Sequence, residues 1–356
     1  MVTEYEKLPA ALLPWYWENA RDLPWRRDRE PYHIWVSEIM LQQTRTQTVC
    51  DYFNRFLTAL PHIQDLARVS ENQLLKLWEG LGYYSRAKNL QKAAQLICEN
   101  YDGRFPNDYA SIRALPGIGP YTAGAIASIC FDLPTPAVDG NVLRVAARIT
   151  NDTTPIDLPE MKSSVSEGLA AVYPKNACGD FTQALMELGS TVCTPRSPKC
   201  TLCPASSFCR AKEAGTAALL PVRLPKQEKR VEEKTVFLFS FEDKLALNRR
   251  TEPGLLSGLW QFPNVPGLLD TQAALETASS FGLRPRELVR ELHRNHIFTH
   301  IRWEMTCYEI LCDAAPKNFT WATVPDISAY YALPTAFRQL LTSESTSLTI
   351  TRKDIS

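Results

Sequence analysis

Four of the ten cysteines lie close together, and their spacing limits the fold of this chain more than any other feature does. They follow the pattern Cys193-x6-Cys200-x2-Cys203-x5-Cys209, whereas the other six are scattered singly and are typical of small buried side chains. Four thiolates on one short loop can close a tetrahedral zinc site or hold an iron–sulfur cluster. Structural zinc sites usually pair two Cys-x2-Cys knuckles, and this chain has one. The residues predict a metal-bound loop and leave both metals open.

Length and charge bound the class of protein. A chain of 356 residues predicts about two domains, each able to bury its own core. The net charge is zero, so a nucleic-acid partner would have to be bound by local patches and backbone amides. No apolar stretch reaches the roughly eighteen residues that span a bilayer, and we expect a cytoplasmic protein with no membrane association. In that compartment disulfides are rare, which favours the metal-bound loop.

The run Leu115-Pro-Gly-Ile-Gly-Pro120 predicts a tight turn between two helices, because proline and glycine permit backbone angles that other residues resist. Pro120 suits the first position of the second helix, so amides of the turn and of the helix start point outward. Such amides bind anions, and a phosphodiester is the obvious candidate. Further along, Asp139 precedes apolar residues at helical spacing, and we expect it to cap that helix.

A second carboxyl of interest lies on the helix predicted for residues 32–44. Glu38 shares a face with Ile34, Trp35 and Leu41 at helical spacings. An apolar setting disfavours the charged form of a carboxyl, so its pKa rises and it can hold a proton near neutral pH, as a general acid must. The alternative is a glutamate that faces solvent, and Asp139 could likewise be no more than a helix cap.

Taken together, these motifs resemble one family. The hairpin with Asp139, the run Ser37-Glu-Ile-Met-Leu-Gln-Gln-Thr44 and the cysteine spacing are similar to those of the helix-hairpin-helix base-excision DNA glycosylases of MutY type. The resemblance implies an α+β multidomain fold, with an all-α glycosylase domain at residues 1–222 that contains a helix-hairpin-helix at 112–131. It also implies an iron–sulfur loop at 193–209, in which a [4Fe-4S] cluster is held by Cys193, Cys200, Cys203 and Cys209.

The resemblance assigns roles to individual residues. Glu38 would protonate adenine, and Asp139 would stabilise the sugar cation, oriented by Tyr121 and Asn141. The base pocket would be formed by Trp25, Arg26, Leu41 and Gln183. Contacts to DNA would come from Gln43, Thr44, Gly117 and Gly119. The turn that starts at Gly80 would project Leu81 and Tyr83 toward the strand opposite the excised base, since an aromatic side chain on such a turn can wedge between bases.

The C-terminal part changes character. Residues 223–234 predict a linker whose alternating charges are expected to be solvated. Residues 235–350 are predicted to form a second, α/β domain, because the run Gly254-Leu-Leu-Ser-Gly-Leu-Trp-Gln-Phe-Pro263 resembles the opening of a Nudix fold. A Nudix hydrolase needs a cluster of glutamates that binds a divalent metal, and the helix expected near 270–281 lacks it. The domain is therefore predicted to recognise DNA without hydrolytic chemistry.

The most distinctive stretch of this domain is the triplet of Phe298, Thr299 and His300, between two predicted strands. MutY-type enzymes carry Phe-Ser-His on this loop and sense 8-oxoguanine with it. The resemblance therefore implies that these three residues contact 8-oxoguanine. Thr299 keeps the hydroxyl group that can hydrogen bond the modified base and adds a methyl group.

One position separates two classes of enzyme. Relatives of endonuclease III type carry a lysine in the second helix of the hairpin, and its amine can form a Schiff base with the sugar and cleave the strand. This chain has Tyr121 there, and a phenol cannot form that intermediate. The resemblance thus implies a monomeric, monofunctional glycosylase that removes adenine paired with 8-oxoguanine or guanine in double-stranded DNA, at the bacterial nucleoid. The alternatives are an endonuclease III-like enzyme acting on damaged pyrimidines and a non-enzymatic DNA-binding protein.

Overall fold

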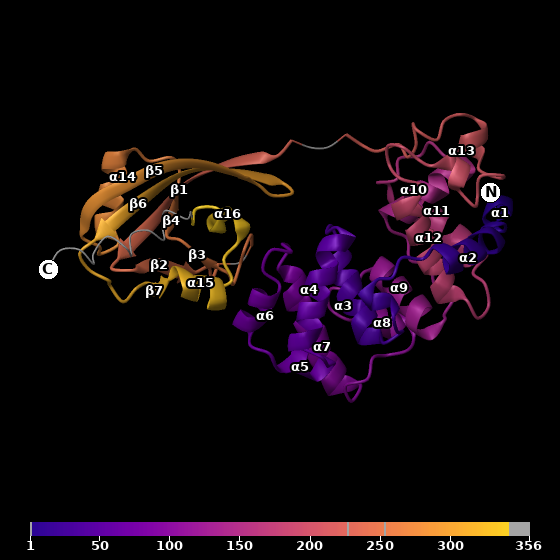
Figure 1. The fold of residues 1–356 in the computed structure, drawn as a ribbon, viewed down its shortest axis with the longest axis horizontal. Coiled ribbons are helices and arrows are strands. Elements are labelled where there is room, and N and C mark those ends of the chain that lie inside the picture. Colours follow the sequence, from indigo (N-terminus) through magenta and orange to yellow (C-terminus); the bar gives the residue numbers. More distant parts are fainter. Residues whose placement is uncertain (1, 226–227, 253, 342–356) are drawn as a thin grey trace. The chain divides into compact units, whose positions relative to one another are not determined.

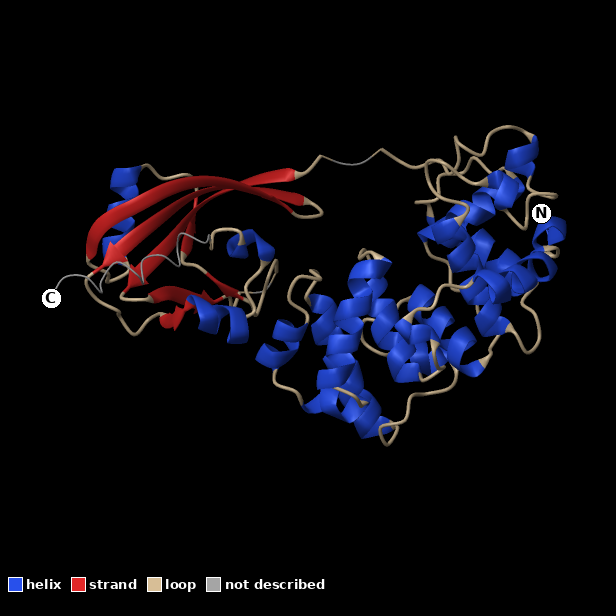
Figure 2. Ribbon diagram, in the orientation of Figure 1, coloured by secondary structure: helices blue, strands red, loops and turns tan. Residues whose placement is uncertain are grey.

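The structure is a computed structural model that describes residues 2–225, 228–252 and 254–341. The chain forms two compact units, one of Met1–Arg68 with Asn89–Pro225 and one of Val69–Lys88 with Lys226–Ser356. The first unit is helical, and the second contains the sheet (Figures 1 and 2). The predicted α+β multidomain fold class is confirmed.

Short helices joined by short connections build the first unit. Their bounds are α1 (Val2–Tyr5), α2 (Leu8–Asn19), η1 (Pro24–Arg26), α3 (Pro31–Leu41), α4 (Thr46–Ala59), α5 (Ile63–Arg68), α8 (Tyr109–Ala114), α9 (Pro120–Phe131), α10 (Gly140–Thr150), α11 (Pro159–Ala170), α12 (Cys178–Thr191), η2 (Cys200–Leu202) and α13 (Arg210–Glu213). Helix α7 (Ser85–Asn100) begins in the second unit and continues in the first.

Helix α9 lies deep in the first unit. Its residues 122–129 are all buried, and α3, α8 and α12 contact it. Small side chains allow this close approach: a Cβ atom added to Gly124 would lie 2.1 Å from the carbonyl oxygen of Pro136. Pro120 occupies the first turn, where a residue without an amide hydrogen costs the helix nothing. The sequence 115–131 therefore forms the predicted turn followed by a buried helix.

Helices α10 and α12 share a second core. Apolar residues of α10 recur at helical spacing, and Val142 and Ile149 belong to one buried cluster with Phe181 and Leu185 of α12. Asp139 caps α10, as the sequence predicts, because its carboxylate accepts hydrogen bonds from the backbone amides of Asn141 and Val142 at 2.9 and 2.7 Å. This packing fixes Asp139 at the end of a buried helix.

Within the described residues of the second unit, a seven-stranded mixed sheet has the order β3-β2-β1-β6-β5, with β4 paired to β1 and β7 paired to β2. The strands are β1 (Arg230–Phe241), β2 (Lys244–Arg249), β3 (Trp260–Gln261), β4 (Asn264–Pro266), β5 (Pro285–Ile297), β6 (Ile301–Cys312) and β7 (Thr320–Thr323). Strands β1 and β6 are parallel, and the register places Arg230 opposite Ile301. The remaining pairs are antiparallel.

Helices cover both faces of the sheet. Helix α14 (Thr271–Ser280) packs on the face that carries Phe237 and Phe239, and it occupies the position predicted for the Nudix-like helix. Helices α15 (Val324–Tyr330) and α16 (Thr335–Arg338) pack on the other face, against Trp303 and Phe262. Successive side chains of β1 and β6 point to opposite faces of the sheet, so these strands contribute buried residues to both cores.

The boundaries differ from those predicted for domains 1–222 and 235–350. Residues 69–88, with helix α6 (Glu71–Leu77), belong to the unit that holds the sheet, because α6 contacts α15 and its side chains hydrogen bond to that part of the chain. Strand β1 begins at Arg230, inside the predicted linker 223–234. The predicted end of the second domain, residue 350, lies outside the described residues.

The charges at the end of that predicted linker are ordered by one tryptophan. The indole Nε1 of Trp303 donates to the Glu232 carboxylate at 2.9 Å, and the Lys234 ammonium lies 4.8 Å from the centre of the Trp303 ring. A cation over an indole face is favourable, and more so when it is partly shielded from water. The expectation of solvated charges is wrong for Glu232 and Lys234. These two residues are two positions apart on strand β1, so both side chains lie on the side of the strand that faces Trp303.

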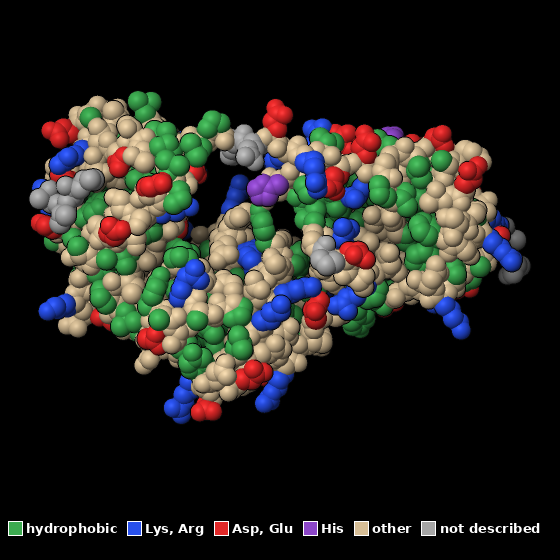
Figure 3. Space-filling view, turned by 180° about the vertical axis from the view of Figure 1, so that it is seen from behind, with side chains coloured by type: hydrophobic (Ala, Val, Ile, Leu, Met, Phe, Trp, Pro, Cys, Tyr) green, Lys and Arg blue, Asp and Glu red, His purple; other side chains and the backbone are tan. Residues whose placement is uncertain are grey.

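The surface shows charges of both signs. Lysine and arginine side chains are interspersed with aspartate and glutamate on the face drawn in Figure 3, in keeping with a net charge of zero. No described helix is long and apolar enough to cross a membrane.

Candidate active site

A cavity of about 540 Å³ in the first unit brings together residues from distant parts of the chain. It contains every residue predicted for catalysis and for the base pocket, and two of those predicted to contact DNA. These residues are Glu38, Asp139, Tyr121, Asn141, Trp25, Arg26, Leu41, Gln183, Gln43 and Thr44. The fold thus places the two candidate carboxyl groups in one cavity, at the walls formed by α3 and by the start of α10.

Glu38 is a buried acid on α3. Only 5% of the residue is exposed, and burial, helped by the negative charge of Asp139, raises its pKa to about 7. Two groups oppose this rise: the phenol of Tyr121, which donates a hydrogen bond to Oε2 of Glu38, and the positive charge of Arg26. A substantial fraction of Glu38 therefore holds its proton at neutral pH, which is the protonation state that a general acid needs.

The partner of Tyr121 differs from the prediction. Tyr121 was expected to orient Asp139, but its hydroxyl group donates to Glu38. Burial and the two neighbouring carboxyl groups raise the pKa of Tyr121 well above its usual value, so the phenol keeps its proton and remains a donor. The sequence could not show which carboxyl group Tyr121 contacts, because Glu38 precedes Tyr121 in the chain and Asp139 follows it.

Asp139 is held by its own helix. Its Oδ1 accepts the two backbone amides at the start of α10, and its Oδ2 accepts the Asn141 side-chain amide at 2.7 Å. Burial raises the pKa of Asp139, and these three donors oppose the rise. A carboxyl group surrounded by donors is favoured in its charged form, whereas Glu38 has one donor and apolar walls. The two groups are thus arranged for different protonation states.

Glu187 on α12 is a buried charge that the sequence analysis missed. Its carboxylate accepts hydrogen bonds from Arg21 at 2.6 Å and from Arg26 at 2.8 Å, and all three residues line the cavity. Burial raises the pKa of Glu187, but the hydrogen bonds and charges of the two arginines outweigh it and lower the pKa. The available signal was helical spacing, because Glu187 follows Gln183 by one helical turn.

Three further residues predicted for the site reach the cavity from three different parts of the chain. Trp25 of η1 is buried and meets the Phe53 ring edge-on, with ring centres 5.6 Å apart. Gln43 follows the end of α3 in a left-handed conformation, with φ at 60°, which turns the chain beside the cavity. Gln183 faces the cavity from α12.

The two glycines of the hairpin differ from each other. Gly117 has φ at 77°, and a Cβ atom there would lie 2.7 Å from Cβ of Asn89, so both the angle and the space require glycine. Gly119 is the N-cap of α9 with φ at −84°, which any residue can adopt, and nothing lies within 4 Å of an added Cβ. The prediction that Gly119 needs an unusual backbone angle is therefore wrong.

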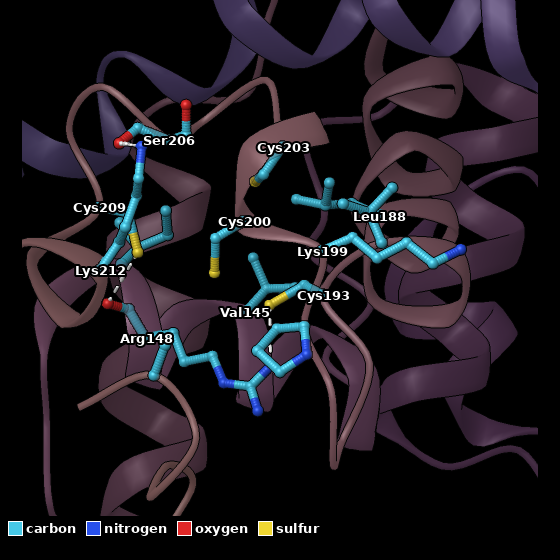
Figure 4. A pocket seen from close by; sticks show the side chains of 14 residues that line it. Val145, Arg148, Leu188, Cys193, Lys199, Cys200, Cys203, Ser206, Cys209 and Lys212 are labelled. Atoms are coloured by element: carbon cyan, nitrogen blue, oxygen red, sulfur yellow. Dashed lines mark hydrogen bonds between the residues drawn. The ribbon is translucent and has the colours of Figure 1, made fainter. Parts of the chain in front are cut away.

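The four clustered cysteines line one pocket of the first unit. Figure 4 shows their side chains around a common space, with Arg148 beside Cys193. In the described parts of the chain, no group of three or more histidine, cysteine, aspartate or glutamate residues is arranged to hold a metal ion.

Two arginines of α10 tie this loop to the active site. Arg148 is 1% exposed and donates to Sγ of Cys193 at 3.2 Å. Arg144 donates to the carbonyl oxygen of Cys193 and to the Asn141 side-chain oxygen, both at 2.8 Å. Because Asn141 in turn donates to Asp139, a continuous chain of hydrogen bonds connects Cys193 with the Asp139 carboxylate.

A second cavity, of about 690 Å³, lies within the second unit. Its walls include the turn at residues 80–85 and the loop that carries Phe298, Thr299 and His300. Leu81 and Tyr83 were both expected to project from the turn, but Leu81 is 6% exposed and only Tyr83, at 42%, is available at the surface. Leu81 is buried because glycines on both sides adopt positive φ and fold the turn back on itself.

Aromatic contacts order the loop between β5 and β6. The Phe298 ring lies edge-on to His296 and to Trp303, with ring centres 4.6 and 4.8 Å apart. The Phe298 carbonyl oxygen accepts a hydrogen bond from the Lys229 ammonium at 2.7 Å. Phe298 is thereby half-buried, while Thr299 and His300 are exposed at the tip.

The fold and the first cavity define a base-excision DNA repair protein. The model of the HhH-GPD superfamily base excision DNA repair proteins matches residues 36–167, and the NUDIX domain model matches residues 235–343. A solved thermostable thymine-DNA glycosylase is 28% identical and superposes with a TM-score of 0.55, covering 60% of this chain and 98% of that one.

Curated relatives narrow the class. The adenine DNA glycosylase of Mus musculus is 34% identical, covering 92% of this chain and 76% of the mouse protein. That of Buchnera aphidicola subsp. Schizaphis graminum is 35% identical, covering 71% of this chain and 73% of the relative. This chain belongs to the adenine DNA glycosylase family: it is a hydrolase of N-glycosyl bonds that acts on DNA in base excision repair.

Replacing Glu187 by glutamine tests the ion cluster in the cavity wall. We expect the free energy of unfolding to fall by about 2 to 3 kcal/mol at pH 7, since two arginines lose their buried partner and one of them is partly solvated. The pKa of Glu187 is lowered in the folded chain, so its charge stabilises fully above the unfolded pKa and ceases to do so as pH falls through the folded one. The difference from wild type should therefore shrink on acidification.

Denaturant titrations at several pH values measure this difference. Glu18→Gln on the exposed side of α2 is the matched control and should change stability by less than about 0.5 kcal/mol. A Glu187→Gln effect that is equally small, or one that grows toward acid pH, would contradict the account of the cluster.

Proposed function

We propose that this enzyme hydrolyses the N-glycosidic bond of adenine paired with 8-oxoguanine, or with guanine, and leaves the DNA strand intact. The single observation that carries the chemistry is the pair of carboxyl groups in one cavity: buried Glu38, with its pKa raised to about 7, and half-buried Asp139, surrounded by hydrogen-bond donors. One neutral and one charged carboxyl group are what the hydrolysis of a glycosidic bond requires.

The first step assigned to the site is proton donation. Adenine is flipped from the duplex into the cavity, at an unstacking cost of a few kcal/mol that contacts to the DNA offset. The Glu38 carboxyl group gives its proton to N7 of the purine, which makes the base a better leaving group. The bond between C1′ and N9 then breaks, and its electron pair stays with adenine. The hydrogen bond from Tyr121 stabilises the Glu38 carboxylate that this step leaves.

The second step concerns the sugar. The carboxylate of Asp139 stabilises the positive charge that develops on the ring. Asn141 fixes the carboxylate through its side-chain amide and is itself fixed by Arg144. Water adds to C1′ and gives up a proton to the Glu38 carboxylate, which completes the hydrolysis and restores the acid. Among the residues that the structure describes, no lysine lines the cavity, so strand cleavage through a Schiff base has no nucleophile there.

The hairpin is assigned to the DNA backbone. Gly119 is the N-cap of helix α9 and gives it no side-chain cap, so the first amides of the helix can donate hydrogen bonds to a phosphate oxygen. Open space around the Gly119 Cβ position lets a phosphate approach the backbone closely. This contact would hold the strand that carries the excised base.

The second cavity is assigned to the base opposite adenine. Exposed Tyr83 on the turn and exposed Thr299 and His300 on the loop line the same cavity. An aromatic wedge fills the space in the stack, and a hydroxyl group can hydrogen bond 8-oxoguanine. Phe298, held between His296 and Trp303, supports the loop from inside.

The cysteine loop is assigned a [4Fe-4S] cluster. Four thiols of one short loop line a common space, and their x6, x2, x5 spacing, with a single Cys-x2-Cys knuckle, favours an iron–sulfur cluster over zinc. Cys193, Cys200, Cys203 and Cys209 would hold the cluster, which supplies a fold-stabilising cross-link when bound. Arg148 already donates to Sγ of Cys193, as a thiolate ligand requires.

Substitution of the acid tests the chemistry. Glu38→Gln should lower the single-turnover rate of adenine release by about 10² to 10⁴, because glutamine cannot donate the proton. Wild-type activity should decline as pH rises through about 7. Tyr121→Phe removes a hydrogen bond that lowers the Glu38 pKa, so the pKa rises and this alkaline limb moves to higher pH.

The control for that shift is Tyr173→Phe, whose hydroxyl group bonds Thr182 outside the cavity and should leave the limb in place. Unchanged excision by Glu38→Gln would refute the acid assignment. In the same assay the abasic strand should stay intact, and a borohydride-trapped adduct formed as fast as base release would refute the monofunctional assignment.

Recognition of 8-oxoguanine is tested at the loop tip. Thr299→Val keeps the shape of the side chain and removes the hydroxyl group, and we expect the preference for adenine opposite 8-oxoguanine over adenine opposite guanine to fall about three- to tenfold. Thr299→Ser should keep the preference. Equal preferences in wild type and Thr299→Val would show that the hydroxyl group does not contact the base.

Metal analysis tests the cysteine loop. The purified protein should contain about four iron and four sulfide ions per chain, and Cys200→Ala should lose both together with stability. Cys50→Ala, away from the loop, is the control and should keep full iron content. A single zinc ion per chain, with no sulfide, would overturn the assignment.

A further inference from the structure

A partly buried ion network lies directly before the turn that presents Tyr83. Oε2 of Glu79 accepts a hydrogen bond from the Lys76 ammonium at 2.7 Å, and Oε1 accepts the backbone amide of Leu333 at 2.7 Å. The Arg338 guanidinium pairs with the same Oε1 at 2.5 Å. The side chains of Glu79 and Lys76 are only 11% and 19% exposed, so their charges depend on one another.

Lys76 continues this network to the end of a helix. Its ammonium also donates to the carbonyl oxygens of Ile327 and Tyr331, at 3.3 and 3.2 Å. These carbonyl groups belong to the last turn of α15 and the residue after it, where a cation is favoured. Residues 76–79 are thus fastened to residues 327–338 by polar contacts from both segments.

The turn that follows is held as one body. Arg86 donates to the carbonyl oxygens of Leu81 and Gly82 at 3.0 and 3.1 Å, and the indole of Trp78 donates to Gly82 at 3.1 Å. Gly80, Gly82 and Tyr83 all adopt positive φ, a conformation that Tyr83 tolerates only under such constraint. A turn that is rigid within itself takes its position from the anchor at its start, which is Glu79.

The same anchor fixes the opposite wall of the second cavity. Pro334 and Thr335 line that cavity, and they lie between the two residues that bind Glu79, Leu333 and Arg338. Together with the contacts of Lys76, the Glu79 carboxylate therefore holds the Tyr83 turn and this wall at a fixed separation. Nothing in its position suggests a contact with the base itself, since Glu79 does not line the cavity.

Resting on the proposed function, we propose that Glu79, held by Lys76 and Arg338, is the positioning residue that makes the second cavity selective for the base opposite adenine. Loss of the carboxylate lets the turn and the wall move apart, so that Tyr83 and Thr299 no longer meet the same base pair. Selectivity falls, while the chemistry at Glu38 and Asp139 is untouched.

The test compares the preference for adenine opposite 8-oxoguanine over adenine opposite guanine, measured as the ratio of kcat/KM values. Glu79→Gln and Arg338→Gln should each lower this ratio about tenfold, with excision opposite guanine near the wild-type level. The double variant should resemble Glu79→Gln alone, because removing Arg338 adds nothing once its carboxylate partner is gone. Glu99→Gln, an exposed glutamate of α7, is the matched control.

Thermal unfolding of each variant separates positioning from stability. A Glu79→Gln protein that is destabilised but keeps the full ratio would overturn this inference and leave the proposed function standing. Additive losses in the double variant would overturn it as well. Equal rates on the two substrates in the wild-type enzyme would instead refute the proposed recognition of 8-oxoguanine, and this inference with it.

Discussion

The chemistry proposed for this protein depends on the raised pKa of Glu38, a buried carboxyl group that lies in the same cavity as Asp139. Water is excluded from Glu38 by α3 and its neighbours, and the charge of Asp139 adds to the effect, so Glu38 holds its proton near pH 7. Burial raises the pKa of Asp139 as well, but Asp139 is the N-cap of helix α10, and the backbone amides of that helix donate hydrogen bonds that oppose the rise. Tyr121 stands beside Glu38 as a permanent donor. The apolar surroundings of Glu38 and the amides at the start of α10 thus favour different protonation states for the two carboxyl groups of this cavity.

Local patterns in the sequence predicted much of this arrangement. The apolar neighbours of Glu38 indicated its burial, and the spacing after Asp139 indicated a helix cap. Long-range contacts could not be predicted. Sequence placed Tyr121 with Asp139, and the fold places it with Glu38. The pairing of Arg21 with Glu187 joins residues 166 positions apart, so no local period reveals it. Residues 69–88 join the sheet unit for the same reason, through contacts near residue 330.

Each of the two units contains a network of charged side chains that holds a different feature in place. In the first, Glu187 with its arginines braces the cavity wall, and a chain of hydrogen bonds runs from Cys193 through Arg144 and Asn141 to Asp139. In the second, Glu79 and Lys76 fasten the turn before Tyr83 to the segment after α15. Both are partly or wholly buried, so breaking one partner leaves an unpaired charge and a displaced loop. Such networks fix the positions of the segments that they join more than they add to the stability of the fold.

The most direct measurement of the central claim is the protonation state of Glu38 in the free enzyme. Carboxyl carbon NMR of protein labelled with ¹³C in glutamate, assigned by comparison with Glu38→Gln, reports that state at each pH. The account predicts a titration with an apparent pKa of about 7 that moves upward in Tyr121→Phe. A Glu38 carboxyl group that titrates at the ordinary value of a solvated glutamate, about 4.3, would contradict it.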